Sequence, residues 1–232
     1  MLPPRSRMIS LSRMMTALLL AAGLSACSGD SGPKPDGPAA LRDAAAAMKD
    51  LTSIGFTIGT EGNPPIQISG GDVKLLRSGD AQGMLKLQQA GNAVETDFVL
   101  IGDLVYFKGP TGGYQKLPRA MVTSVYDPSA VLDPQRGIVK LLSSATGVQG
   151  EATEKVGGKD AHRVKVTLPA GSAATLVPGI TKNLSGQVWI STTDKRLLKV
   201  RADIPQEAGS DAGSVLVTFT EFNQNYKITA PA

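Results

Sequence analysis

The chain has 232 residues, with 24 Lys and Arg, 20 Asp and Glu, one His, one Cys and ten aromatic residues. A single cysteine closes no disulfide within the chain, and one cysteine with one histidine is too few to hold a zinc cluster. Nucleophilic relays of the Ser-His-Asp or Cys-His type would all depend on His162. We therefore expect no metal site, no cofactor and no enzymatic activity.

Most of the net charge of +4 belongs to the N-terminus. Arg5, Arg7 and Arg13 lie within the first 26 residues, which contain no Asp or Glu, so 21 basic and 20 acidic side chains remain in the rest of the chain. A nearly neutral body with few aromatic residues lacks the phosphate-neutralising surface and the stacking platforms of nucleic-acid-binding proteins. Nucleic acid is not an expected partner.

Residues 1–26 have the organisation of a signal peptide. A basic stretch up to Arg13 precedes an apolar run over residues 14–24 and small residues before Cys27. The 13 residues between Arg13 and Cys27 are too few to span a bilayer as a helix, which takes about 20. The sequence LSAC at 24–27 resembles the lipobox of bacterial lipoproteins. An ordinary secretory signal with a chance cysteine is the alternative.

The sequence of residues 27–37 predicts a lipidated cysteine followed by a flexible tether. The sequence SGDSGPKPDG after Cys27 has no apolar side chain that could drive collapse, and its Gly and Pro residues interrupt any helix or strand. About ten such residues have an r.m.s. span of roughly 17 Å. We expect the folded domain, residues 38–232, to tilt and approach partners while it stays attached.

The first helix is predicted over residues 38–51, with Asp36 near its cap and an apolar stripe at helical spacing, namely Leu41, Ala44, Ala45, Met48 and Leu51. From residue 53 to 118, short apolar runs broken by Gly, Asn-Pro, Gly-Asp and Gly-Asn predict consecutive hairpins. Within these runs the apolar residues keep one parity, so each strand should point them to one face.

Two Asp-Pro steps, at 127–128 and 133–134, lie in the middle of the chain. Aspartate accepts hydrogen bonds from free backbone N–H groups, and proline at the first helical position lacks one, so each step can start a helical turn. The second step predicts a helix over residues 134–145, and a short helix is expected near 173–177. Strands return after residue 151, the last of them around residues 226–228. This order predicts an α+β fold in which a long antiparallel sheet packs on a few helices.

Several segments together resemble the LppX/LprA/LprF/LprG family of actinobacterial lipoproteins, the LprG type in particular. They are LSAC at 24–27, YDPSAVLDPQRGIVKLL at 126–142, and GQVWI at 186–190 followed by LLKV. The resemblance implies that the thiol of Cys27 carries a diacylglyceryl group and holds the protein at the outer face of the cell membrane. It also implies a half-barrel sheet curled around helices, with an apolar cavity between them for the acyl chains of lipids or acylated glycolipids.

The resemblance places Leu85 in the cavity wall, and its implied role is to help carry such lipids across the cell envelope, with an export transporter as a further partner. The alternation of the strands and the helical stripe add the other expected lining residues: Leu87, Val94, Phe98, Leu100, Ile138, Leu141, Val164, Val166, Val188, Ile190, Val215 and Val217. A fully packed core is the alternative for all of them.

Two other functions remain open from the residues alone. A membrane-tethered structural or assembly factor without lipid cargo would have a packed interior and an exposed apolar patch. A surface hydrolase could use the acidic pair Glu151 and Glu154, but carboxylates so near in sequence are typical of solvated turns. Trp189 is expected to be a packing residue, with a place at the cavity rim as the alternative.

Overall fold

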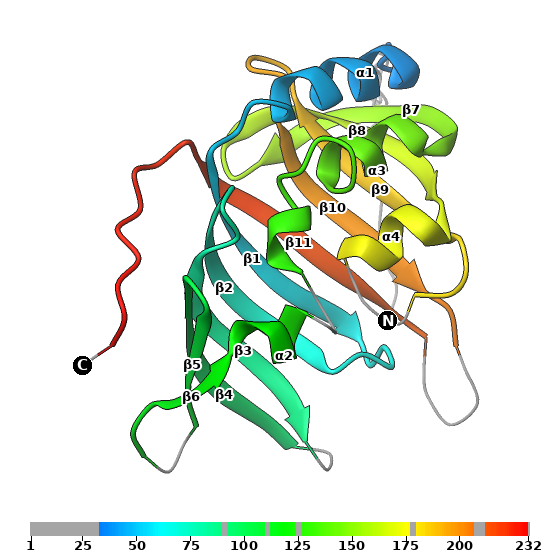
Figure 1. Cartoon of the computed structure of the whole chain (residues 1–232). Helices are drawn as coiled ribbons and strands as arrows, with labels where there is room; N and C mark the ends of the chain where they lie inside the picture. The colour runs from blue at the N-terminus through cyan, green and yellow to red at the C-terminus, as the bar shows by residue number, and fades with distance from the viewer. Residues whose placement is uncertain are drawn as a thin grey trace, which may run out of the picture. The chain divides into compact units, whose positions relative to one another are not determined.

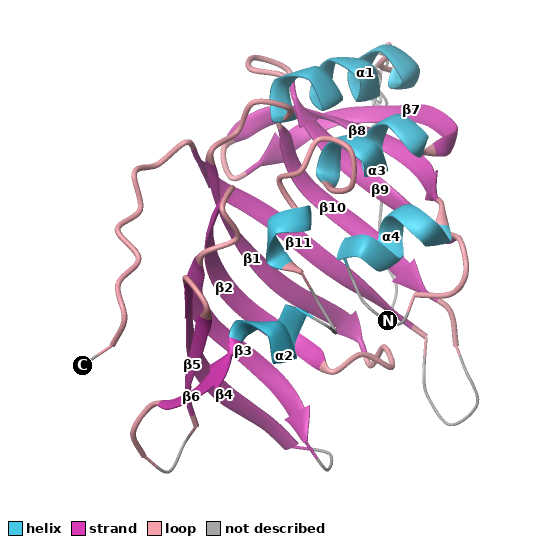
Figure 2. Cartoon of the chain, viewed as in Figure 1, coloured by secondary structure: helices cyan, strands magenta, loops and turns pink. Residues whose placement is uncertain are grey.

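The computed structural model describes residues 33–89, 92–109, 112–123, 127–176, 180–206 and 212–231. Its strands form an 11-stranded antiparallel sheet in the order β6-β5-β4-β3-β2-β1-β11-β10-β9-β8-β7. The sheet curls without closing, and its helices lie on one side of it (Figures 1 and 2). The expected α+β class, a curled antiparallel sheet packed on a few helices, is confirmed.

The sheet consists of two meanders that meet where β1 pairs with β11. The first meander contains β1 (Ser53–Gly62), β2 (Ile68–Leu76), β3 (Ala81–Gln89), β4 (Asn92–Ile101), β5 (Leu104–Lys108) and β6 (Gln115–Pro118). The second contains β7 (Thr146–Val156), β8 (Lys159–Leu168), β9 (Leu184–Ser191), β10 (Leu197–Ile204) and β11 (Gly213–Phe222). Sequence-adjacent strands pair within each meander, so turn chemistry alone fixes most of the strand order.

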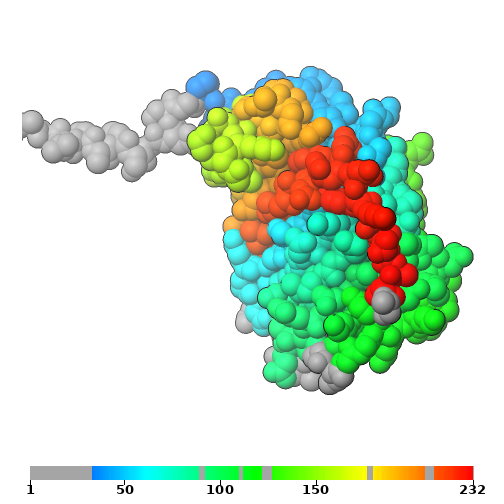
Figure 3. Space-filling model, turned by 90° about the vertical axis from the view of Figure 1, so that its left-hand side faces the viewer, coloured from blue at the N-terminus to red at the C-terminus, as the bar shows by residue number. Residues whose placement is uncertain are grey.

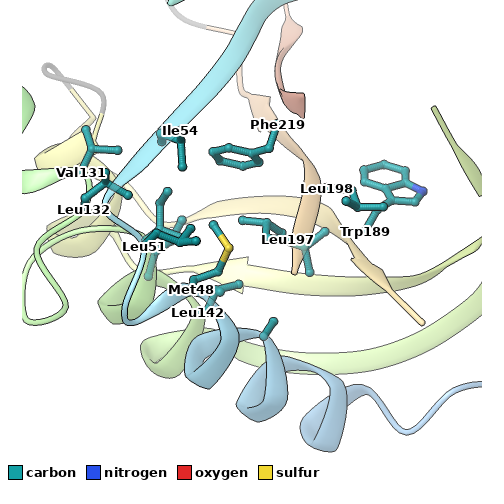
Figure 4. Packing of buried hydrophobic residues seen from close by; sticks show 14 of the residues in the cluster. Met48, Leu51, Ile54, Val131, Leu132, Leu142, Trp189, Leu197, Leu198 and Phe219 are labelled. Carbon is teal, nitrogen blue, oxygen red and sulfur yellow. The ribbon is translucent and has the colours of Figure 1, made fainter. Parts of the chain in front are cut away.

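The helical elements are α1 (Gly37–Met48), α2 (Arg119–Thr123), the 3₁₀ turn η1 (Pro128–Ala130), α3 (Ile138–Ser144) and α4 (Ala170–Leu176). Helix α1 begins as expected, because the side chain of Asp36 accepts a hydrogen bond from the Ala39 N–H at 3.0 Å. It ends at Met48, three residues before the predicted end. The apolar stripe of α1 packs with α3 and the sheet, and Figure 4 shows Met48 and Leu142 gathered near Leu197.

The helix that was expected to begin at residue 134 begins only at Ile138, as α3, so this part of the prediction was wrong. The Asp133-Pro134 step forms a turn instead, in which Asp133 accepts from the Gln135 N–H at 2.8 Å and from Arg136 Nε at 2.8 Å. Arg136 also reaches Asp127, the residue that caps η1, at 3.2 Å. The two Asp-Pro steps are thus joined by one arginine, and the hydrogen bond that Ser129 donates lowers the pKa of Asp127.

Gly137 is required by this turn because its Cα lies against backbone. A Cβ there would collide with the carbonyl oxygens of Ala130 and Val131. The close approach lets the Ile138 N–H donate to the Val131 carbonyl at 3.1 Å, and it brings Val131, Leu132 and Ile138 into the core together. The expected short helix near 173–177 is α4, and residues 177–179 lie outside the described part of the chain.

The strand expected around residues 226–228 is absent from the described residues, and the prediction was wrong. Residues 223–231 instead run as an irregular segment along the outside of the sheet (Figure 3). Asn223 adopts a positive φ of 53°, and its side chain accepts from the Thr52 N–H at 2.9 Å, so the chain turns away before it can pair. Tyr226 then donates to Glu221 Oε2 at 2.6 Å. Side-chain hydrogen bonds hold this segment, in place of the backbone hydrogen bonds of the strand that alternation predicted.

Replacing Gly137 by Ala is expected to destabilise the fold by roughly 1–3 kcal/mol, because the added methyl group overpacks against two carbonyls. Gly171→Ala is the matched control, since nothing lies within 4 Å of a Cβ at that position. Its removal of backbone freedom in α4 should leave stability unchanged or raise it by up to about 1 kcal/mol. Urea unfolding followed by circular dichroism measures both, and equal midpoints would contradict the account of the turn.

Candidate functional site

The helix-facing side of the sheet, called the inner face here, carries a continuous row of paired residues across eight strands. The row is Val164, Val188, Val200, Val217, Ile58, Gly71, Leu85 and Thr96, each pairing with the next on the neighbouring strand. A second row runs through Ile54, Leu75, Ala81, Leu100 and Val105. Register thus brings residues more than one hundred positions apart onto one apolar surface.

The inner face carries no charged residue at the described register positions of β1–β5, β10 and β11. The charged side chains of these strands fall on the opposite parity, where Lys86 and Glu95, for example, form an ion pair of 2.9 Å. Burial of an uncompensated charge costs far more than burial of an apolar group. The side of the sheet that curls around the helices is therefore suited to apolar contents only.

Burial divides the inner face into two regions. Val164 and Val188, at one end of the central row, are 0% exposed, as is Ile54, and they pack with residues of α1 and α3 in the hydrophobic core. Toward the other end of the row the residues are only half-buried, although they point to the same side. We call these residues the inner patch: Phe56, Ile58, Leu85, Phe98, Phe107, Val200 and Val217.

Two glycines pair with residues of the inner patch: Gly71 with Leu85 and Gly83 with Phe98. A Cβ at Gly83 would collide with the carbonyl oxygen of Asp72 on β2, which shows how closely the two backbones approach there. A Cβ at Gly71 would collide with Leu85 Cδ2, so the Leu85 side chain occupies the space that this glycine leaves.

The expected lining residues share one side of the molecule but differ in burial. Half-buried are Leu85, Leu87, Val94, Phe98 and Val217. Buried in the hydrophobic core are Leu100, Ile138, Leu141, Val164, Val166, Val188, Ile190 and Val215. Lining of a cavity by these residues stays a prediction. The inner patch also contains four residues outside the expected set, Phe56, Ile58, Phe107 and Val200, which the same alternation could have found.

Trp189 lies on the outer face, away from the inner patch. It alternates with Val188 and Ile190, and its indole Nε1 donates to Glu154 Oε1 at 2.5 Å. Arg163 bridges Glu154 at 2.6 Å and Glu151 at 3.0 Å. The acidic pair therefore lies on β7 and not in a turn as expected, and Trp189 is a packing residue whose ring also contacts the Lys199 ammonium at 4.7 Å.

His162 occupies β8, as the strand pattern predicted, and is half-buried. Its Nδ1 lies 3.0 Å from the hydroxyl oxygen of Thr153 on β7. This contact joins two paired strands.

Cys27 and residues 1–32 lie outside the described part of the chain, so lipidation and the signal peptide stay predictions. Within residues 33–231, as far as they are described, none of the helices is both long and apolar enough to cross a bilayer.

The model of the LppX_LprAFG lipoprotein family matches residues 36–230, and the chain belongs to this family. The lipoarabinomannan carrier protein LprG of Mycolicibacterium smegmatis is 26% identical over 236 aligned residues, covering 99% of this chain and 98% of the relative.

Two solved structures have the same fold. LprF from Mycobacterium bovis superposes with a TM-score of 0.74 at 22% identity, covering 86% of this chain and 99% of that one. LppX from Mycobacterium tuberculosis gives a TM-score of 0.61 at 23% identity, with 83% and 97% covered. The expected family and the expected fold are confirmed by these matches.

Thiol labelling tests the division of the inner face. In a chain whose only cysteine is replaced, Cys27→Ser, we expect Leu85→Cys to react with a maleimide at least about tenfold faster than Val164→Cys, because a buried thiol reacts only through local opening. Both positions belong to the central row, which makes Val164→Cys the matched control. Equal rates after removal of bound lipid would mean that the row is uniformly packed.

Proposed function

We propose that this protein is a membrane-anchored carrier that holds the acyl chains of a lipid or acylated glycolipid against the inner patch and moves them within the cell envelope. One observation carries the proposal: large apolar side chains point toward the helices, on a face without charges, yet remain half-buried. A protein that only packed its core would bury them as it buries Val164 and Val188. Membership of a lipoprotein family with a named carrier supports the same function.

The physical requirement on such a carrier is enclosure. Two acyl tails of about 15 methylenes each would cost on the order of 24 kcal/mol in water, at roughly 0.8 kcal/mol per methylene. Only a concave apolar surface that contacts the tails on several sides offsets a cost of this size. In the proposed carrier the curl of the sheet would supply such a surface, and the helical elements on its inner side would supply the opposite wall.

The name of one relative supports a cargo class. The Mycolicibacterium smegmatis relative is named as a lipoarabinomannan carrier protein, and it aligns over nearly the whole chain. We infer cargo of the same general kind, in which apolar chains enter the protein and a polar headgroup stays outside. An export transporter that supplies or receives the cargo fits this role.

Membrane attachment through Cys27 completes the proposal. One 14-carbon chain binds a membrane only reversibly, whereas the two chains of a diacylglyceryl group hold it durably. The tether up to residue 36 would leave the folded part free to tilt at the outer face of the membrane.

Leu85→Trp tests the cargo site. The inner patch should accept the larger ring with little loss of thermal stability, and the ring should displace an acyl chain, so lipid that co-purifies with the protein is expected to fall sharply in native mass spectrometry. Val164→Trp is the control within the same row: in the packed region it should cost roughly 1–3 kcal/mol or more. A strongly destabilised Leu85→Trp protein that keeps its lipid would place Leu85 in an ordinary core and favour an assembly factor without cargo.

Cys27→Ala tests the anchor. Removal of the thiol removes the site of the diacylglyceryl group, so the protein should move from the detergent-soluble membrane fraction to the soluble fraction of the native host. The measurement requires that cleavage of the signal be shown by the mass of the mature chain. A cleaved Cys27→Ala protein that stays with the membrane to the same extent would refute lipidation as the anchor.

A further inference from the structure

Exposed apolar side chains gather at one edge of the sheet. Among the described residues, the large hydrophobic side chains that are exposed are Leu104 at 37%, Tyr114 at 38%, Leu117 at 37% and Met121 at 60%. All four fall within 18 consecutive residues, on or beside β5, β6 and α2, which lie next to one another in Figure 1. We call this set the edge patch.

One member of the edge patch, Leu117, adjoins the inner patch, whereas Leu104 alternates with the inner-facing Val105 and lies on the outer face. Strand β6 is an edge strand of the sheet, and its Leu117 pairs with Val105 while Gln115 pairs with Phe107. Leu117 therefore shares the inner side of the sheet with Phe107, a member of the inner patch. An apolar surface continues from the inner face to the edge without a charged residue between Phe107 and Leu117 in this register.

Charge in this segment has one sign. Residues 104–126 contain Lys108, Lys116 and Arg119 and no Asp or Glu. Arg119 pairs with Asp80 at 3.0 Å, and Lys108 lies in register with Asp97 on β4 and 5.9 Å from the centre of the Tyr114 ring. Lys116 is exposed on the edge strand itself. Lysines beside exposed Leu, Met and Tyr side chains are typical of segments that lie in the interface of an anionic bilayer.

We propose that the edge patch docks on an anionic lipid surface and sets the open side of the inner patch against the bilayer. Leu117 and Met121 enter the boundary between headgroups and acyl chains, Tyr114 lies at headgroup depth, and Lys116 contacts lipid phosphates. Docking in this orientation would let an acyl chain pass between the bilayer and the inner patch, and this passage rests on the proposed carrier function. The docking itself does not.

The test uses the mature chain from residue 27 with Cys27→Ser, so that neither signal peptide nor anchor contributes to binding. In the described part of the chain the buried hydrophobic residues lie between Ala40 and Ile228, so residues 27–232 include all of them. Binding is measured by flotation with vesicles of phosphatidylglycerol and phosphatidylcholine in equal amounts, and with vesicles of phosphatidylcholine alone.

We expect the parent to float with the anionic vesicles and Met121→Glu to bind them at least about fivefold more weakly, because the exposed thioether is replaced by a charge of the wrong sign. Thr193→Glu adds the same charge in the exposed turn between β9 and β10 and should stay within about twofold of the parent. Lys116→Gln should weaken binding about fivefold on the anionic vesicles only, since a lysine near such a surface contributes about 1 kcal/mol.

A parent that does not float with the anionic vesicles, or a folded Met121→Glu protein that floats as well as the parent, would overturn docking through this edge, and the patch would then fit a protein partner. The proposals of membrane docking and of cargo binding can be refuted independently of each other. Met121→Glu should keep its co-purifying lipid, and Leu85→Trp should keep its vesicle binding. Loss of lipid without loss of vesicle binding in Leu85→Trp supports both proposals.

Discussion

Alternation with a period of two, kept in register along the central row of eight strands, is the constraint from which the rest of this structure follows. A strand exposes successive side chains on opposite faces, so a slip of one residue between neighbours would exchange the faces of a whole strand. In the central row the inner positions from Val164 to Thr96 stay uncharged through seven successive pairings. A slip between β2 and β3 would turn Lys86 toward the helices and leave it there without a partner. Charge on the outer face thus fixes the register as firmly as apolar contact does on the inner face.

Helices cover the inner face of the curled sheet unevenly. Over β7, β8 and β9 the long helix α1 and the helix α3 cover the inner face, and the residues beneath them are fully buried. Over β3 and β4 the cover consists of short elements, and Leu85 and Phe98 keep contact with solvent. Apolar surface left accessible forgoes about 25 cal/mol per Å² of stabilisation. The closed region must therefore stabilise the fold for both regions, and for this reason we expect its packing to tolerate less change than the inner patch.

The sequence predicted which residues lie on the inner face, but it did not predict how deeply each of them is buried. Leu85 and Val164 sit in strands of the same alternating pattern, and what separates them is the cover above the sheet, which is set by helices remote in sequence. The same limit explains the other differences. Local signals predicted a helix from Pro134, but the contact of Arg136 with Asp127 and the approach of Gly137 to Val131 hold that segment as a turn. Alternation at Tyr226 suggested a strand, but Asn223 turns the chain out of the ladder before a partner is available. Tertiary contacts decided each case.

The first described residues and the edge patch lie at opposite edges of the sheet. Residues before α1 pack on β7, where a Cβ on Gly150 would collide with the Pro35 carbonyl, whereas the edge patch belongs to β5, β6 and α2. Ten strand spacings of about 4.8 Å separate β7 from β6 along the sheet, roughly 48 Å before curling. The eight Cα–Cα steps from Cys27 to Pro35 extend to at most about 28 Å, which is shorter than this span. If the proposed anchor and the edge patch share one bilayer, we expect the molecule to lie along it. The proposed tether would permit that tilt, and release of the edge patch would then raise the inner patch from the surface while the anchor keeps the protein in place.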